Sequence, residues 1–308
     1  MHPIYRMMLG LGLTLLAAND ACADADTGLV RHTLVSGGVE RSYYLHEPAK
    51  PSADKTRPLV IVLHGGGGTG VIGAAMSGFN AKADAEGFLV VYPNGSGRFG
   101  ERLLTWNAKH CCAYAMREKI NDVGFLSDLI DELVRTERVD ARRIYVTGMS
   151  NGAMMSYRAG LELAPKVAAI APIVGAMFGD EVPPALPVPV MIFNSLADKT
   201  VPFDGGPSKI RAGLSVGDAD YKPISFALQF WAKADGCSQS PAVTHEPGVT
   251  ITSFEHCAGD ASVVLYAIDG GGHSWPGGKS SGREGADQPV TSPNATDLMW
   301  AFFARHHR

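Results

Sequence analysis

The chain has 308 residues, of which 45% are hydrophobic and 19% are charged. This composition is typical of a globular protein with enough apolar material for one large core. The formal net charge is −4 and no run of basic residues is present. The sequence therefore does not predict binding to nucleic acid or to an acidic membrane surface.

The first 23 residues have the three parts of a secretory signal peptide. Arg6 and the α-amino group provide a positive region, residues 7–18 are apolar, and Ala21-Cys22-Ala23 offers a small-x-small cleavage site. The apolar run is short for a membrane span. An uncleaved anchor and a lipidated Cys22 are the alternatives. We expect a signal peptide at residues 1–23, and a mature protein that is secreted or periplasmic and independent of a membrane.

Cleavage after Ala23 leaves four cysteines, an even number that favours disulfides in an exported chain. They are Cys111, Cys112, Cys237 and Cys257. Four cysteines allow three connectivities, and the sequence does not choose among them. A bridge between Cys237 and Cys257 closes a modest loop and leaves Cys111 and Cys112 as a vicinal pair. Because no Cys-x-x-Cys is present and His110 is poorly spaced for chelation beside Cys111, we expect no metal site.

Short apolar runs alternate with helix-like segments along the chain. The predicted strands at 29–35 and 40–46 are joined by Ser36-Gly37-Gly38 and form a hairpin. The later runs are mostly apolar, as in parallel strands buried on both faces. These runs are 58–63, 88–92, 143–147, 167–171, 190–193 and 263–268. Helices are predicted from the glycine run to about residue 86, and at 122–134, 153–163, 223–234 and 295–306. The alternation predicts an α/β fold, a mostly parallel sheet covered by helices on both faces, in one domain spanning residues 24–308.

One predicted strand leads directly into Gly148-Met149-Ser150-Asn151-Gly152, and a helix-forming stretch follows. Glycines at positions 148 and 152 allow a strand to reverse sharply into a helix with the serine hydroxyl exposed. The five-residue pattern occurs by chance in many proteins, so the interpretation depends on the flanking strand and helix. We hypothesise that Ser150 is the nucleophile of an esterase.

A serine hydroxyl is a weak nucleophile that needs a base, and the base needs an orienting acid. In such a sheet both partners follow later strands, the acid before the histidine. Asp198 follows the strand at 190–193, and His273 follows the strand at 263–268 in a glycine-rich loop. A solvated turn aspartate and a surface histidine are the alternatives. Position and order favour Asp198 as the acid and His273 as the base.

An ester hydrolase also needs donors aimed at the developing oxyanion. The backbone N–H of Asn151, directly after the nucleophile, and that of Gly66, in the loop 64–68, are the predicted donors. The glycines of that loop also fit a flexible turn, but no Gly-Lys-Ser/Thr completes a phosphate loop. His64 is expected to hold the loop. Trp106 and Trp275 are candidate walls of the substrate cleft, with core packing as the alternative for both.

Several motifs follow one another from about residue 30 to the C-terminus. They are His64-Gly65-Gly66-Gly67-Gly68, Tyr92-Pro93-Asn94-Gly95, Cys111-Cys112, Asp122-Val123-Gly124-Phe125-Leu126, Gly148-Met149-Ser150-Asn151-Gly152, Ala197-Asp198 with Val201-Pro202, and Gly272-His273-Ser274-Trp275-Pro276-Gly277. Together they resemble the polyhydroxybutyrate depolymerase and feruloyl esterase group of the α/β-hydrolase superfamily. The resemblance implies an α/β-hydrolase fold and a Ser-His-Asp esterase without metal or cofactor, with Ser150 as nucleophile, Asp198 as acid and His273 as base.

Members of that group act on polyesters or their oligomers, on feruloyl and acetyl esters of plant polysaccharide, and on synthetic poly(aspartic acid). We expect hydrolysis of a polyhydroxybutyrate-type polyester or its oligomers, with a feruloyl or acetylxylan esterase and a poly(aspartic acid) hydrolase as alternatives. Secreted depolymerases that attack solid polymer often carry a linker and a binding domain. This chain ends after its catalytic domain, which favours soluble oligomers or small esters as substrates.

Two rival functions use the same residues differently. A peptidase or amidase would share the triad, although this length supplies no recognised peptide-binding domain. A non-catalytic binding protein is disfavoured because nucleophile, acid and base are all present. The choice of ester depends on the loops 95–120, 175–187 and 203–222, whose conformation the sequence does not predict. The oligomeric state is also not predicted.

Overall fold

The computed structural model describes residues 22–24, 28–48, 56–207, 220–238 and 240–308. Residues 1–21 of the predicted signal peptide and residues 208–219 of the loop 203–222 lie outside the described residues. Within the described ranges, no helix is both long enough and apolar enough to cross a bilayer. Cys22 and Ala23, the last residues of the predicted signal peptide, lie in the short strand β1 (Cys22–Asp24).

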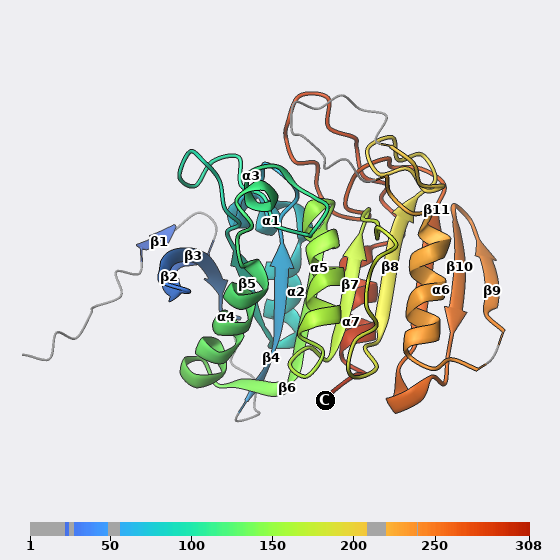
Figure 1. Ribbon diagram of the computed structural model, residues 1–308, viewed down its shortest axis with the longest axis horizontal. Coiled ribbons are helices and arrows are strands. Elements are labelled where there is room, and N and C mark those ends of the chain that lie inside the picture. Colours follow the sequence, from blue (N-terminus) through green and yellow to red (C-terminus); the bar gives the residue numbers. More distant parts are fainter. Residues whose placement is uncertain (1–21, 25–27, 49–55, 208–219, 239) are drawn as a thin grey trace, which may run out of the picture.

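The described chain is built around one eleven-stranded sheet, ordered β1-β2-β3-β5-β4-β6-β7-β8-β11-β10-β9 (Figure 1). The six central strands, from β5 to β11 in this order, pair in parallel, and the strands at both edges pair antiparallel. The strands are β2 (Leu29–Ser36), β3 (Val39–His46), β4 (Arg57–Leu63), β5 (Leu89–Pro93), β6 (Val139–Met149), β7 (Ala169–Ile173), β8 (Val190–Ser195), β9 (Ala242–Glu246), β10 (Val249–Phe254) and β11 (Val263–Ile268).

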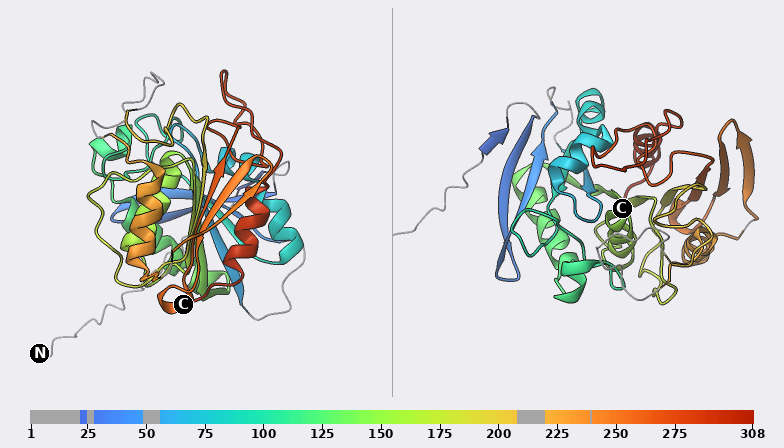
Figure 2. Two further views of the ribbon diagram at one scale, coloured as in Figure 1. Left: turned by 90° about the vertical axis from the view of Figure 1, so that its right-hand side faces the viewer. Right: turned by 90° about the horizontal axis from the view of Figure 1, so that it is seen from above.

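Helices cover both faces of this sheet, as Figure 2 shows from the side and from above. The helices α4 (Asp122–Thr136), α5 (Asn151–Glu162) and α6 (Ile224–Ala234) pack on one face. The helices α1 (Gly70–Ser77), α2 (Phe79–Glu86) and α7 (Ala295–Phe303) pack on the other. Side chains of β4 alternate between the two layers, with Ile61 in the first core and Val62 in the second. The predicted α/β-hydrolase fold, with its N-terminal antiparallel hairpin, is confirmed.

Several elements differ from the sequence prediction for local reasons. The helix expected up to residue 86 is two helices, because Gly78 between them adopts a left-handed conformation with φ 73°. A short helix, α3 (Ala113–Arg117), interrupts the loop 95–120. The antiparallel strands β9 and β10 were not predicted, because they lie at the sheet edge and carry no continuous apolar run.

Two disulfides are present in the described chain. Cys237–Cys257 ties the end of α6 to the segment that follows β10, and Cys111–Cys112 joins the vicinal pair in the loop before α3. Of the three possible connectivities, the structure therefore has the one that pairs neighbours in sequence. Only the first of these bridges closes a loop of appreciable length, with a sequence separation of 20.

The sheet topology places the connections that follow four strands at the same end of the sheet. The strands β4, β6, β8 and β11 are parallel, so their carboxyl ends lie on the same side of the sheet, uppermost in Figure 1. Leu63 at the end of β4 pairs with Gly148 of β6, and Ser195 at the end of β8 pairs with Ile268 of β11. The segments that follow these strands carry the predicted oxyanion loop, nucleophile, acid and base.

Candidate active site

Ser150 occupies a sharp turn between β6 and α5. Its backbone has φ 59° and ψ −122°, a conformation that a residue with a side chain rarely adopts. The Ser150 N–H donates to the carbonyl oxygen of Ile173 at 2.9 Å, and its own carbonyl accepts from Met154 N–H at 3.0 Å. These bonds anchor the strained residue on both sides. Strain of this kind is characteristic of functional turns.

The two glycines around Ser150 are required by packing as well as by the turn. A Cβ atom on Gly152 would collide with the carbonyl oxygen of Leu63, and one on Gly148 would lie 2.7 Å from the same oxygen. The elbow is therefore pressed directly against the end of β4. This close approach places Ser150 beside the glycine loop that follows β4.

His273 and Asp198 are joined by a hydrogen bond. The Nδ1 atom of His273 lies 2.7 Å from Oδ2 of Asp198. Since an ionised carboxylate only accepts hydrogen bonds, Nδ1 carries the proton and Nε2 is left as an acceptor. The other carboxylate oxygen of Asp198 accepts the N–H groups of Thr200 and Val201 at 2.7 and 2.9 Å. The Asp198 side chain is fully buried, whereas that of His273 is 15% exposed.

Ser150 and His273 line one cavity of about 290 Å³. Its walls come from the glycine loop after β4, from α1, from the elbow and from the loop that follows β11. The lining residues are Gly65, Gly66, Gly68, Ile72, Met76, Met149, Ser150, Thr200, His273, Ser281, Arg283, Glu284, Gly285, Ala286 and Asp287. The predicted nucleophile, base and oxyanion loop thus meet in the same space, and the predicted acid lies behind the base.

The loop after β4 packs against the elbow. A Cβ atom on Gly65 would lie 3.5 Å from that of Ser150, and one on Gly66 would lie 3.7 Å from that of Asn151. The carbonyl oxygen of Gly65 accepts hydrogen bonds from His64 Nδ1 at 2.8 Å and from Gly68 N–H at 2.9 Å. Because C=O and N–H point in opposite directions in a trans peptide, these two bonds also fix the direction of the Gly66 N–H.

His64 is a neutral scaffold residue. Its Nε2 atom accepts the N–H of Gly95 at 3.0 Å, so Nδ1 must carry the proton that binds the carbonyl oxygen of Gly65. Burial, reinforced by the positive charges of Arg283 and Arg41, lowers the pKa of His64 to about 4. His64 is therefore uncharged at neutral pH and supports the loop as expected.

The positions of Trp106 and Trp275 favour core packing, the alternative given for both residues, over a wall of the cavity. Both indoles are buried, at 0% and 2% exposure, and neither lines the cavity. The Trp275 Nε1–H donates to Thr296 Oγ1 at 3.0 Å. The Trp106 Nε1–H donates to the carbonyl oxygen of His64 at 3.0 Å. Both side chains hold segments next to the site in place.

Asn151 is held by the backbone of Trp106 on both sides of its amide. Its Oδ1 accepts the Trp106 N–H at 2.7 Å, and its Nδ2–H donates to the Trp106 carbonyl at 3.0 Å. Within the described residues, the backbone N–H groups of Asn151 and Gly66 form no hydrogen bond. Two oriented backbone donors are thus available beside Ser150.

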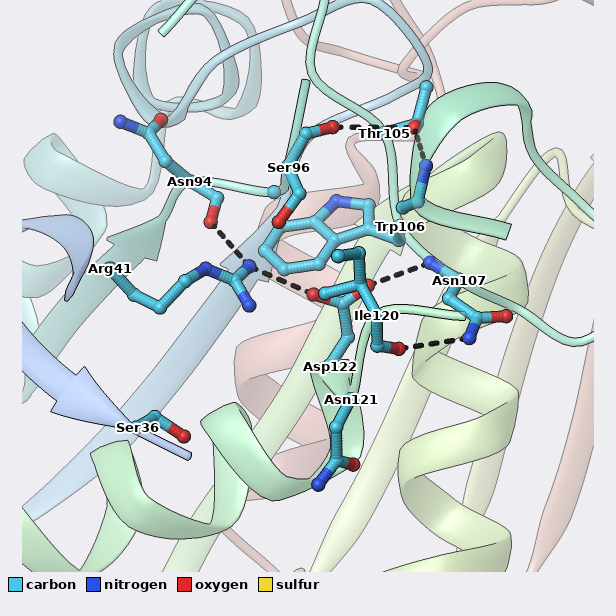
Figure 3. A network of polar contacts seen from close by, with 12 residues as sticks. Ser36, Arg41, Asn94, Ser96, Thr105, Trp106, Asn107, Ile120, Asn121 and Asp122 are labelled. Carbon is cyan, nitrogen blue, oxygen red and sulfur yellow. Dashed lines mark hydrogen bonds and ion pairs between the residues drawn. The ribbon is translucent and has the colours of Figure 1, made fainter. Parts of the chain in front are cut away.

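A buried ion pair anchors the segment that carries Trp106 (Figure 3). Arg41 from β3 donates to Asp122 Oδ1 at 2.8 Å and to the carbonyl of Asn94 at 3.1 Å. The second oxygen of Asp122 accepts the N–H of Asn107 at 2.7 Å. Burial raises the pKa of Asp122, and the charge of Arg41 opposes that shift. The network connects the hairpin, α4 and the loop 95–120, and so supports the Trp106–Asn151 contact.

Asp287 is a residue that the sequence prediction missed. Its Oδ2 accepts the backbone N–H of His273 at 2.6 Å, and it lines the cavity. An aspartate in a polar loop has no sequence signal that reveals which backbone group it contacts.

Comparisons with known proteins identify the family to which the chain belongs. The profile of the family described as esterase PHB depolymerase matches residues 41–206. The putative esterase NocK of Nocardia uniformis subsp. tsuyamanensis is 34% identical over 82% of this chain and 76% of its own. The chain belongs to the esterase PHB depolymerase family. The predicted family and enzyme class, a carboxylic ester hydrolase, are confirmed.

More distant members of this fold differ in length. Feruloyl esterase B of Piromyces equi is 32% identical over 75% of this chain, which spans 42% of that protein. The structure of an acetyl xylan esterase from Aspergillus awamori superposes with a TM-score of 0.59 at 14% identity, covering 89% of this chain and 99% of that one. The latter similarity concerns the fold alone.

Proposed function

We propose that this family member is an exported serine esterase that cleaves carboxylic esters through an acyl-enzyme on Ser150. The observation that carries the proposal is the 2.7 Å bond between His273 Nδ1 and Asp198 Oδ2, which leaves His273 Nε2 free to accept a proton in the cavity that Ser150 lines. The strained backbone of Ser150 and the oriented Gly66 and Asn151 N–H groups support it.

The mechanism has two steps. The Ser150 Oγ attacks the ester carbonyl carbon while His273 Nε2 takes its proton, and Asp198 stabilises the resulting imidazolium. The oxyanion accepts hydrogen bonds from the N–H groups of Gly66 and Asn151, each worth about 3–4 kcal/mol in the strongest cases. His273 then protonates the departing alcohol. Water, deprotonated by His273, attacks the acyl-enzyme and releases the acid.

The proposed substrate is a polyhydroxybutyrate-type polyester or its oligomers. Ile72 and Met76 from α1, together with Met149, give the cavity an apolar part suited to a short branched acyl chain. A volume of about 290 Å³ has room for a small number of such units. The family assignment supports the same substrate class.

Feruloyl ester hydrolysis is the second candidate, favoured by the 32% identity to feruloyl esterase B. A panel of hydroxybutyrate oligomer, methyl ferulate, acetylated xylan and poly(aspartic acid) separates the possibilities. We expect the highest kcat/KM with the hydroxybutyrate oligomer. A higher value with methyl ferulate would replace our substrate assignment and leave the mechanism intact.

The mechanism is tested separately from the substrate. Ser150→Ala should abolish hydrolysis of p-nitrophenyl butyrate while the protein stays folded, whereas Ser253→Ala on β10, near the other end of the sheet, should keep wild-type activity. Hydrolysis by a folded Ser150→Ala protein would exclude the mechanism. Export is tested by sequencing the N-terminus of the protein recovered outside the cytoplasm, which should begin at Asp24.

A further inference from the structure

One loop contacts both halves of the proposed catalytic machinery. The chain after β11 passes over the carboxyl ends of the strands before it enters α7 (Figure 1). The N–H of Gly277 donates to the carbonyl of Val290 at 2.8 Å, which brings the two ends of the segment 277–290 together. We refer to residues 277–290 as the strap. Six strap residues, from Ser281 to Asp287, line the cavity.

The first anchor of the strap is Asp287. Its Oδ2 accepts the backbone N–H of His273 at 2.6 Å. Directly before His273, Gly272 has φ 55°, and a Cβ atom there would collide with the Asp287 carboxylate. The close approach requires glycine at 272 both for conformation and for space. Asp287 therefore holds the backbone N–H of His273, the proposed base. The glycine directly before His273 restricts the backbone little, so this hydrogen bond supplies the restraint.

The second anchor of the strap is Arg283. Its guanidinium donates to the carbonyl oxygens of Gly66 and Gly67, in the loop that supplies the oxyanion donor. A turn within the strap, in which the Ala286 N–H donates to the Arg283 carbonyl at 3.1 Å, connects the two anchors. One short segment thus contacts the loop that carries His273 through Asp287, and the loop that carries Gly66 through Arg283.

We propose that Asp287 is a positioning residue, which sets the placement of His273 relative to Ser150 through its hydrogen bond to the His273 backbone, while Arg283 fixes the strap to the oxyanion loop. The inference rests on the proposed function. Both anchors are contacts between residues of this chain, and they connect the strap to the loops that carry His273 and Gly66. A misplacement of the base by about 1 Å costs on the order of 100-fold in rate.

The test compares two variants of Asp287 that differ in their ability to accept a hydrogen bond. Asp287→Ala removes the acceptor, so kcat for p-nitrophenyl butyrate should fall by roughly 10- to 100-fold with KM nearly unchanged. Asp287→Asn keeps an oxygen at the same place and should retain kcat within about threefold. Wild-type kcat in Asp287→Ala, or equal losses in both variants, would overturn the proposal.

NMR of the His273 Nδ1 proton distinguishes a positioning role of Asp287 from a role in stability alone. Its downfield proton resonance reports the bond to Asp198, and it should shift or broaden in Asp287→Ala. Asn121→Ala is the matched control, because Asn121 Oδ1 likewise accepts a backbone N–H, from Gly124 at 3.0 Å, but caps α4 away from the cavity. This control should lose stability and keep the resonance. An unchanged resonance in Asp287→Ala would contradict positioning.

Gly272→Ala gives a second route that does not depend on the folding of Asp287→Ala. The added methyl group pushes against the Asp287 carboxylate, so kcat should again fall with KM nearly unchanged. The combined loss in Gly272→Ala with Asp287→Ala should be smaller than the product of the single losses, because the collision partner is gone. Wild-type kcat in Gly272→Ala would contradict the inference.

The result also distinguishes this inference from the proposed function. If Ser150→Ala and His273→Ala are inactive while Asp287→Ala has wild-type kcat, the esterase mechanism stands and the positioning role falls. If Ser150→Ala keeps its activity, the mechanism itself is wrong. If all three variants lose activity in the expected pattern, both stand.

Discussion

The Nε2 atom of His64 accepts the backbone N–H of Gly95 at 3.0 Å, and this bond exists only while the imidazole is neutral. It connects the loop after β5 to the loop after β4. The other ring nitrogen, through its proton, orients the peptide whose N–H is the proposed oxyanion donor. His64, a histidine outside the proposed triad, therefore orients a peptide of the proposed oxyanion loop.

The first prediction concerns the free energy of unfolding as a function of pH. The pKa of His64 is about 4 in the folded protein, below the value of about 6.5 expected in the unfolded chain. As the pH falls below about 6.5, the unfolded state takes up the proton first, so stability decreases until about pH 4. The loss from this group reaches about 3 kcal/mol.

Urea unfolding at a series of pH values measures this loss. The buried His306, whose pKa burial also lowers to about 4, acts in the same direction, so the His64 contribution is taken as the difference between wild type and His64→Gln. An identical pH dependence of the free energy of unfolding in both proteins would refute the predicted contribution of His64. NMR titration of His64 in the wild type provides an independent reading if the variant does not fold.

The second prediction concerns Asp198. Asp198→Asn should lower kcat by on the order of 10³- to 10⁴-fold, because the amide no longer selects the Nδ1–H tautomer of His273. The bonds from Thr200 and Val201 to the other oxygen keep the side chain in place, so stability should change little. Steady-state kinetics with p-nitrophenyl butyrate measures the effect. A loss smaller than tenfold would argue against Asp198 as the acid.

The third prediction contrasts two glycines near the site. Gly152→Ala should destabilise the protein by roughly 3 kcal/mol or more, because its methyl group meets the carbonyl oxygen of Leu63. Gly73→Ala inside α1 has its nearest neighbour, the Cβ of His64, at 3.8 Å and should stabilise by up to roughly 1 kcal/mol. Urea unfolding of both variants provides the comparison. Equal tolerance would contradict the close packing of the elbow on β4.

The fourth prediction separates a scaffold role for Trp275 from a role in substrate binding. Trp275→Phe removes the donor to Thr296 and should cost about 1 kcal/mol of stability. Because the indole is buried outside the cavity, the ratio of KM values for short and long p-nitrophenyl esters should stay as in the wild type. A changed ratio at unchanged stability would restore the cleft-wall interpretation.

The fifth prediction concerns the Cys237–Cys257 bridge. Replacing both cysteines by serine opens a loop with a sequence separation of 20 and should cost about 3 kcal/mol. The bridge lies beyond α6 and β10, away from the cavity, so kcat/KM at 25 °C should remain unchanged. Thermal unfolding and kinetics measured on the same preparation give both values. Lower kcat/KM in a fully folded variant would contradict this separation.

The central strands and the triad order were predictable because they depend on local patterns. β4, β5, β8 and β11 each contain a continuous apolar run, and Asp198 and His273 each follow such a strand in the order that the proposed triad requires. The strands β9 and β10 were missed because β9 is exposed along its whole length and β10 is mostly half-buried, so neither carries such a run.

Contacts made through loop conformation were not predictable. The aromatic character of Trp106 and Trp275 does not reveal whether an indole faces the cavity or the core, and here both face the core. Asp287 approaches His273 only because Gly271 and Gly272 adopt positive φ angles and the strap closes over them. The contact between His273 and Asp287, which are 14 residues apart in sequence, depends on the folded backbone rather than on residue type.

The most direct test of the central claim is covalent labelling of the nucleophile. A fluorophosphonate probe should modify the wild type once, and mass spectrometry of the digested protein should place the adduct on Ser150. Asp198→Asn and His273→Ala should react far more slowly, and Ser150→Ala should not react at all. An adduct on a different serine, or labelling of Ser150→Ala at the wild-type rate, would contradict the account.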